Sequence, residues 1–135
     1  MNYNDLIQLY FERTTALQSY WTLYVVIVGG LLAFSSLRKE PSPLTTAIVC
    51  LLFALFAYEN LSAIRDTGEQ RYATLESIRK ADSAVTGTGT LRGTLEPTLH
   101  PASPGSTIAT HLISDILTIA ALCAMEFRRP KARGI

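Results

Sequence analysis

The sequence of 135 residues lacks the motifs that would fix an enzymatic reaction. It has no glycine-rich phosphate loop, because Gly87, Gly89 and Gly93 precede no nucleotide-binding helix. Serines near His111 stand in no nucleophile-elbow motif, and no Cys/His pairing occurs outside the apolar runs. We therefore predict a non-catalytic protein, with no cofactor and no bound metal.

Cysteine is scarce, with only Cys50 and Cys123 in the chain. Both lie inside apolar runs, and no spacing motif accompanies them. A cysteine in such a run behaves as a small apolar packing residue. We expect neither a disulfide nor an indication of the redox compartment.

Charge is missing from two long stretches, although 17% of all residues are charged. No charged residue occurs from residue 14 to residue 37, or from residue 41 to residue 58. Each run provides the ~20 apolar residues that a helix needs to cross a hydrocarbon core. The sequence thus predicts an all-α integral membrane protein whose first two spans cover about 20–37 and 43–61.

A third span is expected at about 107–127, where Asp115 interrupts an otherwise apolar stretch. An aspartate at the centre of a bilayer costs roughly 2.5 to 3.5 kcal/mol. Residues 116–125, which follow it, are uncharged. Asp115 should therefore lie nearer one membrane face than the middle.

A soluble helical bundle is the alternative, since buried helices of globular proteins can also be uncharged. Two observations favour the membrane. The two long apolar runs are joined only by the short "RKEPSP" segment, and Tyr20, Trp21 and Tyr24 cluster at the start of the first run. Aromatic side chains gather at membrane interfaces.

Basic residues predict the topology. Arg38 and Lys39 occupy the short first connection, and the tail 128–135 is also basic, whereas the segment before the first span has only Arg13. The positive-inside rule places the 38–43 connection and the C-terminus in the cytoplasm. The middle segment also carries basic residues among acidic ones, so the inverted topology stays open. We assign the basic tail to contact with anionic membrane lipid, not to nucleic acid.

Three segments are expected outside the bilayer. Residues 2–19 form an amphipathic lead-in, with Asn2 or Asn4 available as the N-cap. Residues 62–83 carry one apolar stripe, so the second helix should extend beyond the membrane. Residues 84–106 have Gly or Pro at every fourth position of a tetrad repeat, which predicts a loop without helix that is either a linker or a binding loop.

The third span has one polar face. At 100° per residue, its polar side chains and a few apolar neighbours share a sector about 120° wide. These residues are His111, Ser114, Asp115, Thr118, Leu122, Met125 and Glu126. We expect Glu59, His111, Ser114, Asp115 and Thr118 to form an intramembrane polar cluster, with Arg65 or Arg13 as counter-charge.

The first span has a matching stripe of small and hydroxyl-bearing residues. It comprises Thr15, Gln18, Thr22, Gly29, Ala33 and Ser36. Such residues let membrane helices approach closely. We predict that Thr22, Gly29, Ala33 and Ser36 form a helix-packing surface.

Three interpretations of the polar cluster remain. It can be a structural connection between helices, the lining of a proton or ion pathway in a homo-oligomer, or a metal or haem site using His111 with Asp115 or Glu59. The last has the weakest basis, because one His/Asp pair is no dedicated ligand motif. We predict a small polytopic protein that acts as a subunit of a homo- or hetero-oligomeric membrane assembly, with a homo-oligomeric channel as the alternative.

Overall fold

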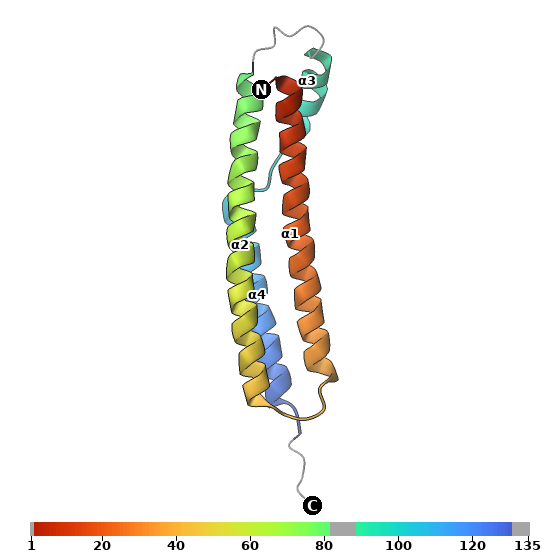
Figure 1. Cartoon of the computed structure of the whole chain (residues 1–135), viewed down its shortest axis with the longest axis vertical. Helices are drawn as coiled ribbons and strands as arrows, with labels where there is room; N and C mark the ends of the chain where they lie inside the picture. Colours follow the sequence, from red (N-terminus) through yellow and green to blue (C-terminus); the bar gives the residue numbers. More distant parts are fainter. Residues whose placement is uncertain (1, 82–88, 131–135) are drawn as a thin grey trace, which may run out of the picture.

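The computed structural model describes residues 2–81 and 89–130. Three long helices form an elongated bundle: α1 (Tyr3–Leu37), α2 (Pro43–Lys80) and α4 (Pro104–Phe127) (Figure 1). Between α2 and α4 lie a short helix, α3 (Gly89–Leu95), and a 3₁₀ turn, η1 (Glu96–Thr98). The described residues contain no strand, so the expected all-α class is confirmed, and all three long helices are long and apolar enough to cross a membrane.

α1 and α2 are much longer than α4. At 1.5 Å per residue, the 35 residues of α1 and the 38 of α2 extend over about 52 and 57 Å, whereas the 24 of α4 extend over about 36 Å. A hydrocarbon core is only about 30 Å thick. The expected lead-in and the extension of the second helix are therefore continuous with their spans. The last residues of the extension predicted to reach residue 83 lie outside the described part of the chain.

Local sequence explains where the helices begin. Asn2 accepts a 2.9 Å hydrogen bond from the Asp5 amide and donates its own amide to the Asp5 carboxylate, which confirms Asn2 as the N-cap. Proline follows the N-cap residue of both other long helices, at Pro43 and Pro104, where its missing N–H costs nothing.

One expectation is wrong: the predicted loop at 84–106 contains α3 and η1, and α4 already begins at Pro104. The contacts of Arg92 explain why α3 forms. Its guanidinium donates to the carbonyl oxygens of Ala81 at 2.7 Å and Arg79 at 2.8 Å, and it pairs with Glu96 one turn later at 2.8 Å. Tertiary contact with the end of α2 thus overrides the low helix propensity of the Gly and Thr residues. Residues 84–88 of that loop are outside the described ranges.

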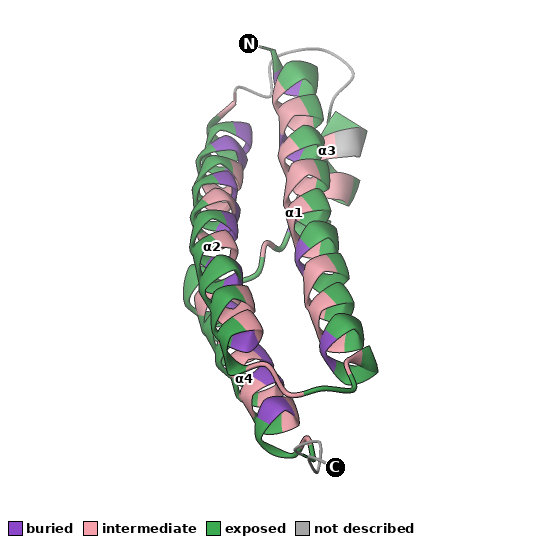
Figure 2. Cartoon of the chain, turned by 60° about the horizontal axis from the view of Figure 1, so that its bottom comes forward, coloured by how far each residue is buried: buried purple, intermediate pink, exposed green. Residues whose placement is uncertain are grey.

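Exposed large apolar side chains are confined to the lower half of the bundle in Figure 1, with Phe11 as the one exception among described residues. They lie between Leu23 and Leu37 on α1, between Leu44 and Tyr58 on α2, and between Leu112 and Phe127 on α4. Buried residues line the sides on which the helices face one another (Figure 2). The upper half comprises the first half of α1, the last part of α2, α3 and η1, and it carries the alternating charges.

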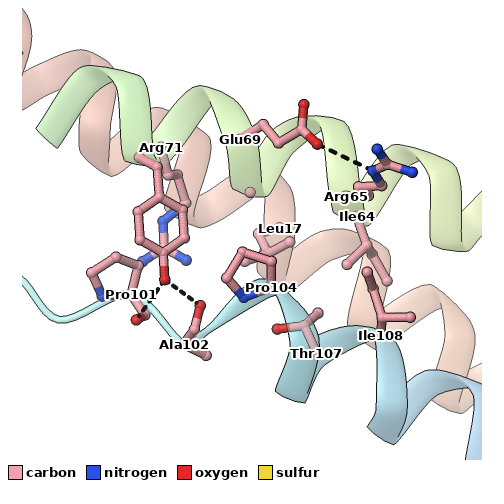
Figure 3. A pocket seen from close by; sticks show the side chains of 12 residues that line it. Leu17, Ile64, Arg65, Glu69, Arg71, Pro101, Ala102, Pro104, Thr107 and Ile108 are labelled. Carbon is pink, nitrogen blue, oxygen red and sulfur yellow. Dashed lines mark hydrogen bonds and ion pairs between the residues drawn. The ribbon is translucent and has the colours of Figure 1, made fainter. Parts of the chain in front are cut away.

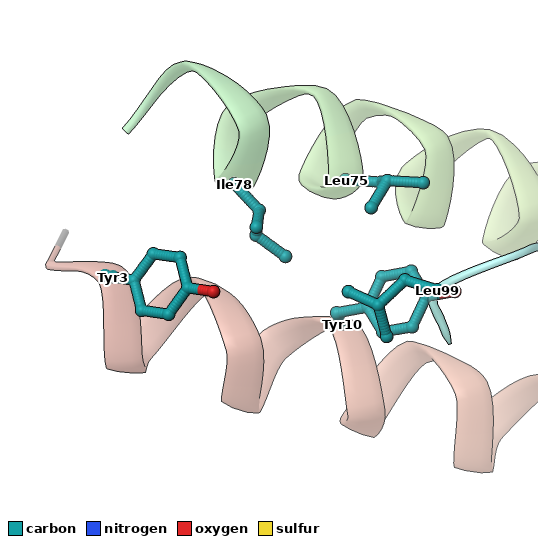
Figure 4. Packing of buried hydrophobic residues seen from close by; sticks show 5 residues of the cluster. All are labelled: Tyr3, Tyr10, Leu75, Ile78 and Leu99. Carbon is teal, nitrogen blue, oxygen red and sulfur yellow. The ribbon is translucent and has the colours of Figure 1, made fainter. Parts of the chain in front are cut away.

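The upper half has a small core of its own. Tyr3 and Tyr10 of α1 pack against Leu75 and Ile78 of α2, and Leu99, just after η1, completes the cluster (Figure 4). Ile78 is fully buried. This cluster anchors the segment between α2 and α4 to the two long helices.

Candidate functional site: a polar connection among three helices

His111 occupies the centre of the candidate site. It lies on α4 and is completely buried, with 0% of its surface exposed. Its Nδ1 lies 2.9 Å from Asp115 Oδ2, one turn further along α4, and its Nε2 lies 3.2 Å from Oδ1 of Asn60 on α2. Both ring nitrogens therefore have partners.

The chain of hydrogen bonds extends from His111 to α1 in both directions. The Tyr24 hydroxyl donates to Asp115 Oδ1 at 2.8 Å, and Asn60 Nδ2 donates to the carbonyl oxygen of Tyr20 at 3.3 Å. We call these five residues, Tyr20, Tyr24, Asn60, His111 and Asp115, the interhelical tie. It links α1, α2 and α4 through an unbroken series of polar contacts.

The contacts orient the Asn60 amide. Because Asn60 Nδ2 donates to the Tyr20 carbonyl, its Oδ1 faces His111, where it can accept from Nε2. The other ring nitrogen, Nδ1, faces the Asp115 carboxyl group. A carboxyl group with hydrogen-bond partners costs far less to bury than an unpaired one.

Aromatic rings enclose the imidazole of His111. The ring centroid of Tyr24 lies 4.4 Å away and that of Trp21 lies 5.6 Å away. Both aromatic residues belong to α1, and Tyr24 also packs on Phe53 of α2. Both ring pairs are tilted, with interplanar angles of 53° for Trp21 and 45° for Tyr24. Water is excluded from this region by the same rings.

The predicted cluster residues divide into two groups. His111 and Asp115 are joined as expected, whereas Glu59 is exposed and its neighbour Asn60 makes the contact instead. Ser114 and Thr118 donate to carbonyl oxygens of their own helix, each at 2.8 Å. No ion pair involves Arg13 among described residues, and Arg65 pairs with Glu69 at 3.1 Å, so neither arginine is a counter-charge of the tie.

Sequence reasoning missed Tyr24 and Asn60 as members of the site. Tyr24 was assigned to an interfacial aromatic belt, but only 4% of its surface is exposed, in the interior of the bundle. Asn60 could have been recognised as a candidate site residue, since an uncharged amide at the end of an apolar run needs a hydrogen-bond partner. Its partner is 51 residues away in the sequence, so no local pattern could identify it.

A second polar cluster surrounds Glu126 at the lower end of the bundle. Glu126 belongs to the predicted polar face of α4. The Glu126 carboxylate accepts hydrogen bonds from the Ser42 amide at 2.6 Å and the Thr46 hydroxyl at 2.9 Å. It also pairs with Arg38 at 3.6 Å and with Arg129. Arg129 in turn donates to the carbonyl oxygens of Arg38 and Ser35, which joins the end of α1 to the end of α4.

The four predicted helix-packing residues of α1 all face outward. Thr22, Gly29, Ala33 and Ser36 are exposed, and a Cβ atom placed on Gly29 would meet no other atom within 4 Å. Gln18 and Thr15 continue this exposed stripe toward the upper half. The stripe thus contacts no other helix of its own chain.

Within the described ranges, no group of three or more His, Cys, Asp or Glu side chains could hold a metal ion. Cys50 and Cys123 are free thiols on α2 and α4. Comparison of the chain with protein-family models, curated proteins and solved structures finds no match in any of the three.

Proposed function

We propose that this protein is a three-span integral membrane protein that acts as a non-catalytic subunit of a membrane assembly. The band of exposed apolar side chains supports the membrane location. Val25, Leu51 and Ile116, one on each long helix, are 62–67% exposed, and they represent a belt that surrounds the lower half. A water-soluble monomer rarely exposes so large a continuous apolar surface.

The outward stripe of α1 is the observation that carries the assembly proposal. Gly29 and Ala33 are four residues apart, the spacing at which small residues allow two membrane helices to approach closely. Thr22 extends the same face by about two turns before Gly29, and Ser36 extends it by about one turn after Ala33. All four residues are exposed. A second copy of this chain or a helix of another subunit would contact this face.

The alternative, a homo-oligomeric channel lined by the polar face of α4, has less support. His111, Thr118 and Glu126 are buried within a single chain, and their polar groups have partners there. A pore between copies would need this face to be turned outward. We expect liposomes that contain the oriented protein to show no proton flux between pH 5 and 8; a flux lost in Asp115→Asn would favour the channel.

The test of the assembly proposal uses two neighbouring glycines. A Cβ on either Gly29 or Gly30 meets no atom within 4 Å, so leucine fits both positions within one chain. The two positions differ by 100° around the helix, and only Gly29 lies in the stripe. Gly29→Leu should lower the oligomeric or hetero-complex fraction in native mass spectrometry from mild detergent, whereas Gly30→Leu should not. Equal effects of both substitutions, or a wild-type chain that is monomeric and without partners, would refute the proposal.

We also propose that the C-terminus is cytoplasmic. The 38–43 connection and the end of α4 lie at the same end of the bundle, joined through Arg38, Glu126 and Arg129, so their basic residues reinforce one another in the positive-inside rule. A reporter fused after Ile135 should be active in the cytoplasm, and one inserted near Gly89 should be active outside. The reverse pattern would establish the inverted topology.

A further inference from the structure

A small cavity lies in the upper half of the bundle, where α4 begins beside α2 (Figure 3). Its volume is about 40 Å³. At 10–15 Å³ for each water, this space holds on the order of three waters. Leu17 of α1, Ile64 of α2 and Ile108 of α4 form apolar walls, and Pro101 and Pro104 lie along the chain that closes one side.

The segment that closes the cavity is held in place by Tyr72. Its hydroxyl lies 3.2 Å from the carbonyl oxygen of Pro101 and 2.8 Å from that of Ala102 (Figure 3). Residues 101–102 therefore stay against α2 at the point where the chain turns into α4. The cavity is therefore a defined feature of the fold, and it is open to the outside beside exposed Arg65 and Glu69.

One cation of the cavity wall has no anionic partner. Arg71 forms no ion pair among the described residues, and its Nε is buried without a hydrogen-bond partner. Its one hydrogen bond within the described chain goes to the Tyr10 hydroxyl at 3.1 Å, and its guanidinium stacks 5.2 Å from the Tyr10 ring centroid. The positions three and four residues away on α2 are Thr67, Gly68, Thr74 and Leu75, so the helix itself supplies no carboxylate.

The other charged side chains of the wall do not compensate Arg71. Arg65 and Glu69 also line the cavity, but they pair with each other at 3.1 Å (Figure 3). The wall therefore keeps one uncompensated positive charge. The first turn of α4 adds the positive end of its helix dipole on the opposite side. A half-buried guanidinium that lacks an anionic partner favours a negatively charged acceptor in the space that it lines.

We propose that this cavity binds a small organic monocarboxylate. A carboxylate matches the planar donor set of arginine, and the Thr107 hydroxyl on the α4 side of the wall can donate to it as well. A short alkyl group on the ligand would contact Leu17, Ile64 and Ile108. The apolar walls disfavour a strongly hydrated inorganic anion, and the small volume disfavours a long chain. This site is independent of the α1 stripe and of the proposed assembly.

Propionate is the probe for the test, added to the full chain in detergent and followed by calorimetry and by thermal unfolding. We expect saturable binding and a raised melting temperature, with propionate and butyrate more effective than phosphate. Arg71→Gln should weaken propionate binding roughly tenfold or more, because a charge-assisted hydrogen bond is lost. Arg79→Gln is the matched control, since Arg79 is an exposed arginine of the same helix that does not line this cavity.

Gly68→Leu tests the cavity without removing the charge. Gly68 lines the space, and a Cβ there meets no atom within 4 Å, so leucine should fill the cavity while the helix keeps or gains stability. This variant should unfold at or above the wild-type temperature and no longer respond to propionate. Absence of saturable binding to the wild type, an unchanged response in Gly68→Leu, or a stronger effect of decanoate or phosphate than of propionate would overturn the proposal.

Discussion

The Tyr24 hydroxyl donates a 2.8 Å hydrogen bond to Asp115, across 91 residues of sequence and from α1 to α4. This bond accounts for the aspartate that interrupts the third apolar run. Asp115 also lies 2.9 Å from fully buried His111, which contacts Asn60 of α2. His111 and Asp115 of α4 thus find their polar partners within a single chain.

Asp115→Asn should be tolerated, because an asparagine can accept from Tyr24 and donate to a neutral His111 ring. We expect a loss of less than about 1 kcal/mol in unfolding free energy, within the range of a typical net hydrogen bond. Asp115→Leu leaves both partners buried and unpaired and should cost roughly 2–6 kcal/mol, at 1–3 kcal/mol for each group. Denaturant unfolding in detergent measures both. If leucine were no worse than asparagine, the tie would not stabilise the bundle.

Tyr24→Phe removes the hydroxyl and keeps the ring that packs on His111 and Phe53. The loss of this hydrogen bond leaves the half-buried Asp115 carboxyl group without its donor from α1 and should lower the unfolding free energy by roughly 1–3 kcal/mol. Tyr20→Phe is the control, since Tyr20 joins the tie only through its backbone carbonyl. Similar melting temperatures for the two variants would contradict this assignment.

Glu126→Gln tests the lower cluster. The substitution keeps an acceptor for the Ser42 amide but removes the charge between Arg38 and Arg129, whose side chains are only 15% and 8% exposed. Removing one partner of such a buried ion group should cost roughly 3 kcal/mol. Glu40→Gln, at an exposed position of the 38–43 connection, should have almost no effect. Thermal unfolding of the two variants gives the comparison. Equal melting temperatures for Glu126→Gln and Glu40→Gln would exclude a stabilising role for the cluster.

We predict that ionisation of Tyr3 lowers the stability of the upper half at alkaline pH. Burial, and then the nearby Glu96 carboxylate, raise the pKa of Tyr3 above its ordinary value of 10.0. A raised pKa means that the folded state holds the proton more tightly, so this contribution to stability is complete below pH 10.0 and is lost as the pH rises above it. Circular dichroism should show a smaller drop in melting temperature between pH 9 and 11 for Tyr3→Phe than for the wild type. An identical drop would mean that other groups control the alkaline transition.

Much of the architecture could be predicted from the sequence because it depends on local patterns. Two uncharged runs and one apolar stretch interrupted by Asp115 indicate the three long apolar helices, and composition alone carries that signal. Asn2 was identified as a candidate cap from its type and position, and the His111–Asp115 pair followed from the four-residue spacing on one helix. The outward stripe of α1 was also visible in the sequence, although its direction was not.

Only the tertiary structure decided which residues complete each site. His111 contacts Asn60, Glu126 contacts Thr46 and Arg71 contacts Tyr10, each on another helix. The register between the helices sets these pairs. That register explains why Asn60 contacts His111 while the adjacent Glu59 points outward, because one residue of rotation is 100°. It also explains the helical turn at 89–95, which depends on Arg92 reaching the end of α2. Helix formation follows from short-range composition, whereas the contacts between helices depend on packing that brings together residues far apart in the chain.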